Sequence, residues 1–144
     1  MKKEVTILLV EDNEGDIVLT VEALKMANIT NKIVVVRDGE EALKYLHGEG
    51  PDANPELPDL ILLDINLPRI DGKEVLARIK NDDKLKFIPV VILTTSESEK
   101  DVMESYINHA NCYITKPVDF NKFMQVIHII KDFWITLVKL PTNH

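Results

Sequence analysis

Short apolar runs alternate along the chain with longer segments in which apolar residues recur at helical spacing. The runs are continuously apolar and rich in β-branched residues, which is typical of strands buried on both faces of a parallel sheet. The predicted strands are residues 6–10, 33–36, 60–63, 90–93 and 112–114. The predicted helices are residues 16–26, 39–46, 72–80, 97–108 and a last, longest helix with Asp119 as its N-cap. This alternation predicts one domain over residues 1–144, a doubly wound α/β fold with five parallel strands and five helices.

An insertion rich in Gly and Pro, residues 47–58, interrupts this alternation and is predicted to be a loop. It joins a helix to the following strand, so it should lie at the amino ends of the strands. Ligands of such folds bind at the carboxyl ends. We therefore expect the loop to lie away from the chemistry, with Asp52 and Glu56 as surface charges.

Four of the five predicted strands end in side chains that can carry chemistry. The first is followed by Glu11 and Asp12, the third by Asp64, the fourth by Thr94 and the fifth by Lys116. Carboxylates that converge at one sheet edge repel each other, by on the order of 4 kcal/mol per pair at about 4 Å and an effective dielectric constant near 20. Mg²⁺ would remove this repulsion, because it prefers oxygen ligands and retains several waters. A dianionic phosphoryl group would then fit between the metal ion and Lys116.

These residue types suit the transfer of a phosphoryl group to a carboxylate. Asp64 would be the nucleophile, Lys116 would pair with one phosphoryl oxygen as a point charge, and the Thr94 hydroxyl would donate a hydrogen bond to another. Taken alone, an acid at a strand end is most often a solvated or capping group, and a lone Thr or Lys is even weaker evidence for a chemical role. The conjunction at four strand ends favours the chemical interpretation.

Composition and charge exclude several other classes. A formal net charge of −7 argues against nucleic-acid binding, which needs clustered Lys and Arg. The single cysteine, Cys112, is predicted to pack in the core rather than act as a nucleophile, and it fits a reducing cytoplasm. The first apolar run stops at Glu11, too early for a signal peptide or a membrane span, and the four scattered histidines have no zinc-site spacing. We expect a soluble, cytoplasmic protein.

The strand-end residues resemble the motifs of response regulator receiver domains from two-component systems. The matching segments are residues 9–13 (LVEDN), 63–68 (LDINLP) with the following Asp71-Gly72, 93–95 (LTT) and 113–117 (YITKP). Thr94 and Lys116 follow Asp64 by 30 and 52 residues, and these spacings also match. The resemblance implies the flavodoxin-like strand order 2-1-3-4-5.

The resemblance also implies a role for each residue of the acidic site. Asp64 would be the phosphoacceptor, Asp12 would bind Mg²⁺ directly, and Glu11 would act on it through water. The backbone carbonyl of Asn66 would complete the protein ligands. No second acid stands two residues after the nucleophile, where an aspartate-nucleophile phosphatase would need one, so we expect no activity beyond the protein's own phosphorylation and dephosphorylation.

The switch is implied by the same resemblance. Thr94 would swing towards the phosphoryl group, Tyr113 would turn inward behind it, and the Lys116–Pro117 peptide bond would be cis. The alternative for Tyr113 is an aromatic residue that packs against the last helix. A second open function is a binding module that keeps the acidic metal site but is never phosphorylated.

The segment 112–120, the DFW sequence at 132–134 and the insertion resemble single-domain regulators that are partnered with bacterial phytochromes. This narrower resemblance implies a sensor histidine kinase of the phytochrome type as the donor, and a dimer. Only four residues follow Leu140, so we expect output through a protein contact rather than an attached DNA-binding domain.

The last predicted helix is apolar nearly all round. One stripe should face the sheet and comprises Phe120, Phe123, Met124, Ile127, Ile130, Trp134, Leu137 and Val138. A second set on other faces comprises Val126, Ile129, Phe133 and Leu140. The apolar side chains that do not face the sheet must be shielded from solvent by another surface. We favour a homodimer contact over a C-terminal tail that folds back.

Overall fold

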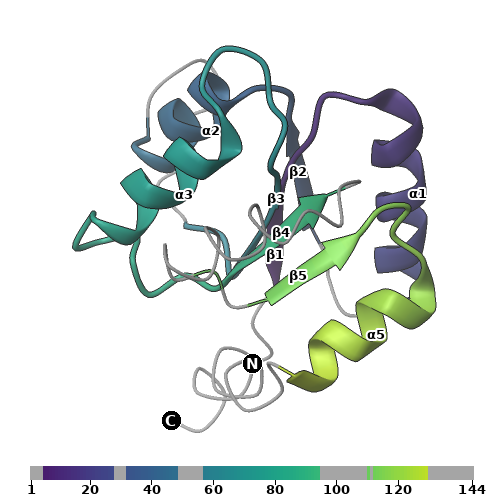
Figure 1. Ribbon diagram of the computed structural model, residues 1–144. Helices are drawn as coiled ribbons and strands as arrows, with labels where there is room; N and C mark the ends of the chain where they lie inside the picture. The colour runs from purple at the N-terminus through teal and green to yellow at the C-terminus, as the bar shows by residue number, and fades with distance from the viewer. Residues whose placement is uncertain (1–4, 28–31, 49–56, 95–109, 111, 130–144) are drawn as a thin grey trace, which may run out of the picture.

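The centre of the molecule is one five-stranded parallel sheet (Figure 1). Its strands are β1 (Thr6–Val10), β2 (Lys32–Val36), β3 (Leu60–Asp64), β4 (Val90–Thr94) and β5 (Cys112–Thr115). Their order is β2-β1-β3-β4-β5, which confirms the predicted fold class and strand order. The computed structural model describes residues 5–27, 32–48, 57–94, 110 and 112–129.

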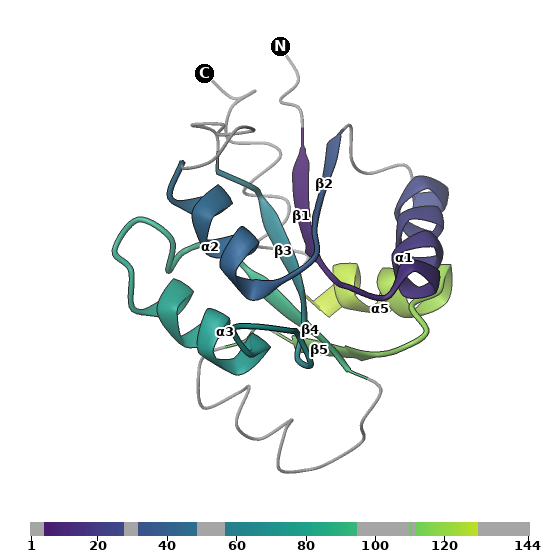
Figure 2. The same cartoon turned by 90° about the horizontal axis from the view of Figure 1, so that it is seen from above.

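Helices cover both faces of this sheet. The described helices are α1 (Glu14–Ala27), α2 (Gly39–Leu46), α3 (Gly72–Lys80) and α5 (Phe120–Ile129). α1 and α5 pack together on one face, and α2 and α3 lie on the other (Figures 1 and 2). The helix predicted at 97–108 lies outside the described residues. In the part of the chain that the structure describes, no helix combines the length and the apolar character needed to span a bilayer.

Side-chain caps set where two of these helices begin. α1 starts two residues earlier than its apolar periodicity predicted, because the Asn13 side chain caps it and accepts a hydrogen bond from the Asp16 amide at 2.9 Å. Asp119 caps α5 as predicted, since its Oδ1 accepts from the Lys122 amide at 2.8 Å. α2 and α3 occupy their predicted bounds.

Burial of the strands depends on their position in the sheet. β1, β3 and β4 are buried along their whole length, as their continuous apolar runs predicted. The same prediction was wrong for the two edge strands: β2 is only half-buried except at Val36, and Tyr113 of β5 is exposed. β2 is an edge strand, so neighbouring elements cover it less completely.

Each face of the sheet has its own apolar cluster. Side chains alternate along β1, so Ile7 and Leu9 join the cluster under α1 and α5, while Leu8 and Val10 join the cluster under α2 and α3. The first cluster includes Leu24 of α1 and Phe123 of α5. The sheet is therefore fixed from both sides, which holds its strand ends in place.

The face of α5 that packs on the sheet differs from the predicted stripe. Phe123 and Val126, three residues apart, are buried in the cluster shared with α1. Met124 was predicted to face the sheet but is 37% exposed, and Val126 was predicted to lie on another face but is 3% exposed. The helix is rotated relative to the prediction, because the sequence offered apolar residues on both candidate faces. The predicted stripe beyond Ile129 lies outside the described residues.

This orientation of α5 predicts unequal effects of two neighbouring substitutions. Phe123→Ala removes a fully buried ring and should lower the free energy of unfolding by about 3–5 kcal/mol. Met124→Ala, the matched control on the exposed side, should change it by no more than about 0.5 kcal/mol. Urea denaturation of both variants measures the difference, and equal losses would show that the buried face is wrongly assigned.

Candidate functional site

The carboxyl edge of the sheet brings together the acids and the amine that the sequence singled out. Glu11 and Asp12 follow β1, Asp64 ends β3, and Lys116 follows β5. Glu11 and Asp64 are 0% and 2% exposed, whereas Asp12 is open to solvent. Thr94 is buried at the end of β4, and its carbonyl accepts a hydrogen bond from the Lys116 amide at 2.8 Å.

Three carboxylates at this edge are close enough to share a cation. One oxygen each from Glu11, Asp12 and Asp64 lie within 4.8 Å of one another. Burial, followed by the hydrogen bond and the charge of Asp64, raises the pKa of Glu11 to about 7, although its hydrogen bond to Lys116 works in the opposite direction. A group of oxygen donors that resists full ionisation fits a hard divalent cation, which would relieve the crowding of negative charge.

The Lys116 ammonium provides the positive charge of the site and contacts three carboxylates. Its Nζ lies 3.0 Å from Glu11 Oε1, 3.0 Å from Asp16 Oδ2 and 3.3 Å from Asp64 Oδ2. Burial by itself lowers the pKa of Lys116, but the hydrogen bonds to Glu11 and Asp16 and the charge of Asp64 outweigh it and raise that pKa well above its usual range. Lys116 is therefore a permanent cation beside Asp64.

Sequence analysis missed Asp16 as part of this site. It was assigned only as the start of a helix, where an acid needs no further explanation because acids stabilise helix N-termini. A signal was present, since an acid in the first turn of the helix after β1 faces the same sheet edge.

A family profile and close relatives match this arrangement. The profile described as "Response regulator receiver domain" matches residues 7–128. The chain belongs to the response regulator receiver domain family. "Response regulator Rcp1" from Synechocystis sp. is 47% identical over 135 residues, which is 94% of this chain and 92% of that protein.

Solved structures of relatives agree with the receiver fold. The phosphorylated cyanobacterial phytochrome response regulator RcpA superposes with a TM-score of 0.78 at 51% identity, covering 92% of this chain and 95% of that chain. The Mn²⁺-bound form of Rcp1 gives a TM-score of 0.76 at 46% identity, covering 90% and 94%. The narrower resemblance to phytochrome-partnered regulators is thereby confirmed.

The helix after the receiver's central acid packs directly on the backbone that carries it. The Gly72 amide donates to the Ile65 carbonyl at 3.2 Å. A Cβ at Gly72 would collide with the Asp64 carbonyl oxygen and lie 2.7 Å from the Ile65 Cα. The Asn66 amide donates to Asp64 Oδ1 at 3.0 Å, so the carboxylate is held from two directions together with Lys116. The close approach at Gly72 gives the Asp-Gly pair of the motif a physical reason.

Tyr113 lies at the surface of the structure, and its inward turn on phosphorylation stays a prediction. Its side chain is 41% exposed and borders a hollow with Lys122, Gln125 and Val126 of α5. This position agrees with the alternative of an aromatic residue against the last helix. The Lys116–Pro117 bond is cis, as predicted.

Cys112 is a core residue of the receiver, as expected. Its side chain is buried in the cluster under α1 and α5, and burial raises the pKa of its thiol to about 11. A thiol that stays protonated at neutral pH is a poor nucleophile. The alternative of a cysteine nucleophile therefore has no support.

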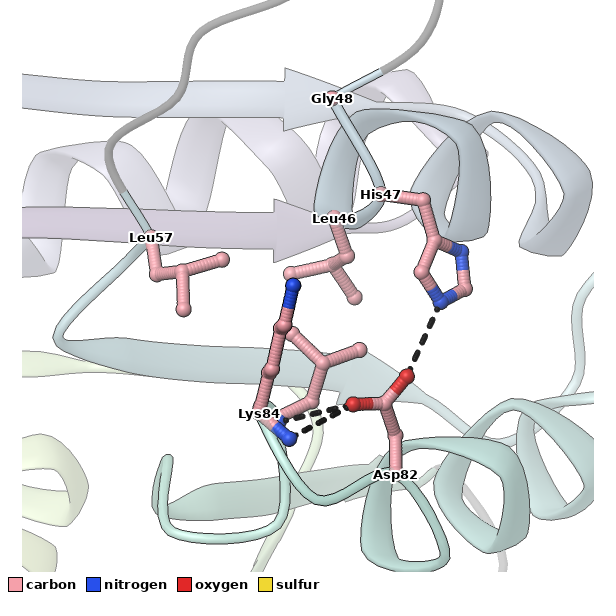
Figure 3. Close-up of a pocket in the computed structure, with 7 residues that line it drawn as sticks. Leu46, His47, Gly48, Leu57, Asp82 and Lys84 are labelled. Carbon is pink, nitrogen blue, oxygen red and sulfur yellow. Dashed lines mark hydrogen bonds and ion pairs between the residues drawn. The ribbon is translucent and has the colours of Figure 1, made fainter.

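A hollow of about 360 Å³ lies at the opposite edge of the sheet (Figure 3). Residues from the end of α2, the start of the β3 segment and the α3–β4 connection surround it, and His47 Nε2 pairs with Asp82 Oδ2 at 3.2 Å. The described ends of the 47–58 insertion line this hollow, which confirms their predicted place away from the acids. Asp52 and Glu56 lie outside the described residues.

The raised pKa of Glu11 predicts how the cation-free receiver responds to pH. The folded state keeps the Glu11 proton up to about pH 7, whereas an unfolded Glu loses it near 4.5, so stability should fall as pH rises through this window. Urea denaturation in EDTA at pH 5 and pH 8 should show a larger fall for wild type than for Glu11→Gln, by on the order of 1–3 kcal/mol. Equal pH dependence in the two proteins would contradict the assignment.

Proposed function

We propose that this receiver domain accepts a phosphoryl group on Asp64 and works as a signalling switch. The observation that carries the proposal is the Lys116 ammonium 3.3 Å from Asp64 Oδ2, beside a cluster of three carboxylates. Asp64 is only 2% exposed, and its other oxygen, Oδ1, accepts a hydrogen bond from the Asn66 amide. One oxygen of the carboxylate is thus anchored while the other faces the amine.

The proposed step is a direct transfer from a phosphohistidine of a sensor histidine kinase. An Asp64 carboxylate oxygen forms a bond to phosphorus while the phosphorus–nitrogen bond of the donor breaks, and the released imidazole takes up a proton. Lys116 holds a positive charge where the phosphoryl oxygens arrive, and the Thr94 hydroxyl would donate to one of them. Hydrolysis by water returns free Asp64 and inorganic phosphate.

The acidic cluster would hold Mg²⁺ for this reaction. Asp12 and Asp64 would be direct ligands, Glu11 would act through water, and the Asn66 carbonyl would complete the protein ligands. When bound, the ion neutralises charge on the phosphoryl oxygens. The Mn²⁺-bound form of the relative Rcp1 supports a divalent cation, and a preference for Mg²⁺ is part of the proposal.

The proposed donor is a kinase of the phytochrome type, acting in the cytoplasm. RcpA, at 51% identity, is a cyanobacterial phytochrome response regulator, which supports this class of partner. Phosphorylation would bias the surface around Thr94 and Tyr113 between two arrangements, and the exposed position of Tyr113 supports one of them as the unphosphorylated form. The output would be a changed surface for protein contact.

Acetyl phosphate provides the direct test of the phosphoacceptor. With Mg²⁺, wild type should gain the mass of one phosphoryl group, and hydroxylamine should remove it because acyl phosphates are labile to this nucleophile. Asp64→Asn should gain nothing. The matched control is Asp71→Asn, which changes an exposed capping acid in the same strand–helix connection and should be phosphorylated like wild type.

Two outcomes would overturn the phosphoacceptor proposal. One is a wild type that gains no mass, which would favour the binding module that is never phosphorylated. The other is an Asp64→Asn variant that gains as much as wild type.

We also propose a homodimer through the C-terminal helix region, because Phe133 and Trp134 add large apolar side chains beyond Phe123 and Val126, which already fill the core. Light scattering at micromolar concentration should give twice 16.4 kDa. Phe133→Glu should return the mass to that of a monomer, whereas Phe87→Glu, which changes a 72% exposed aromatic of the α3–β4 connection, should leave the dimer intact. A monomer in both phosphorylation states would end the dimer proposal.

A further inference from the structure

The contacts of Lys116 include one carboxylate that the proposed chemistry does not use. Glu11 and Asp64 come from strand ends, but Asp16 comes from the first turn of α1. Its Oδ2 is as close to the ammonium as the Glu11 oxygen, at 3.0 Å. The Asp16 side chain is 24% exposed and the Lys116 side chain 7% exposed, so the pair lies at the rim of the site rather than on the open surface.

We infer that Asp16 is a positioning residue, which aims the Lys116 ammonium at the phosphoacceptor oxygen of Asp64. The inference rests on the proposed function, because it concerns the rate at which that site takes a phosphoryl group. It adds a residue of α1 to a site otherwise built from strand ends.

The geometry of an ammonium group supports this role. Lys116 has three N–H donors and no acceptor, on a flexible four-carbon stem that can place the charge in many positions. Glu11 and Asp16 engage two donors from two different elements. The third donor remains for the side of Asp64 Oδ2, which lies 3.3 Å from Nζ and near which a phosphoryl oxygen would arrive. Without Asp16, a single remaining anchor at Glu11 would leave the ammonium free to swing away.

Helix capping does not account for the Asp16 side chain. Its own amide, not its carboxylate, makes the capping hydrogen bond with Asn13. The first turn of α1 also has a second acid, Glu14, whose Oε2 pairs with Arg37 at 2.8 Å. Glu14 therefore offers a matched control, since it carries the same charge in the same turn but pairs with Arg37 instead of Lys116.

A positioning role and a purely electrostatic role of Asp16 predict opposite changes in the phosphorylation rate when its carboxylate is removed. If only net charge mattered, removing an anion from the site would help an anionic phosphoryl donor to bind and would speed the reaction. If Asp16 positions Lys116, its removal should slow the reaction, because a preorganised charge is lost. The direction of the effect distinguishes the two explanations.

The experiment compares Asp16→Asn, Asp16→Glu and Glu14→Gln with wild type in saturating Mg²⁺ and increasing acetyl phosphate. Asp16→Asn should lower the maximal rate of phosphorylation by roughly tenfold, with the half-saturating donor concentration changed by less than about twofold. Glu14→Gln should match wild type within about twofold. Asp16→Glu restores the carboxylate and should recover part of the rate.

A second readout follows the amine itself, without Mg²⁺ or donor. NMR of ¹⁵Nζ-labelled lysine should show an ordered, slowly exchanging Lys116 ammonium in wild type and Glu14→Gln, and a disordered one in Asp16→Asn. The inference would be overturned if Asp16→Asn were phosphorylated as fast as wild type or faster. It would also be overturned if Asp16→Asn were phosphorylated more slowly but its Lys116 ammonium signal were unchanged. Wild type that takes no phosphoryl group would instead refute the proposed function, and the inference with it.

Discussion

The structure depends on one electrostatic constraint, the crowding of carboxylates around a single ammonium group. Lys116 contacts Glu11, Asp16 and Asp64, and two of these acids are almost fully buried. One positive charge does not balance them, which is why burial and the neighbouring Asp64 raise the pKa of Glu11 to about 7. A site with this imbalance is ready for a divalent cation and for the anion that the cation attracts.

The apolar sheet makes this crowding possible. β1 and β3 are buried along their whole length and paired in register, so their ends cannot separate to relieve repulsion. α3 adds a second restraint, because Gly72 lies against the backbone of Asp64 and Ile65 with no room for a side chain. The packing of the core therefore holds the carboxylates close together despite their mutual repulsion. A bound cation would reduce this repulsion.

The sequence predicted those parts of the fold that depend on local pattern. Continuous apolar runs located all five strands, and the caps at Asp38 and Asp71 agree with the predicted starts of α2 and α3. The same patterns could not rank two apolar faces of α5, because the choice between Met124 and Val126 depends on how the helix packs against α1 and the sheet. The partial burial of β2 could not be predicted from local pattern either, since it depends on which strand lies at the edge of the sheet.

The candidate site likewise has residues that the sequence could predict and contacts that it could not. Glu11, Asp64 and Lys116 could be predicted, because parallel strands bring their carboxyl ends to one edge whatever the details of packing. Asp16 could be placed near this edge from its position in the first turn of α1, but its contact with Lys116 could not be predicted, since it depends on the position of a helix over a lysine 100 residues away in the sequence. The orientation of Tyr113 likewise depends on tertiary packing next to α5.

The most direct test of the account is to locate a cation in crystals of the metal-free protein soaked in Mn²⁺. The account predicts an anomalous peak between the carboxylates of Asp12 and Asp64, which an excess of Mg²⁺ should displace, with the Lys116 ammonium still beside Asp64. Asp12 and Asp64 side chains that point apart, with no cation between them, would contradict it.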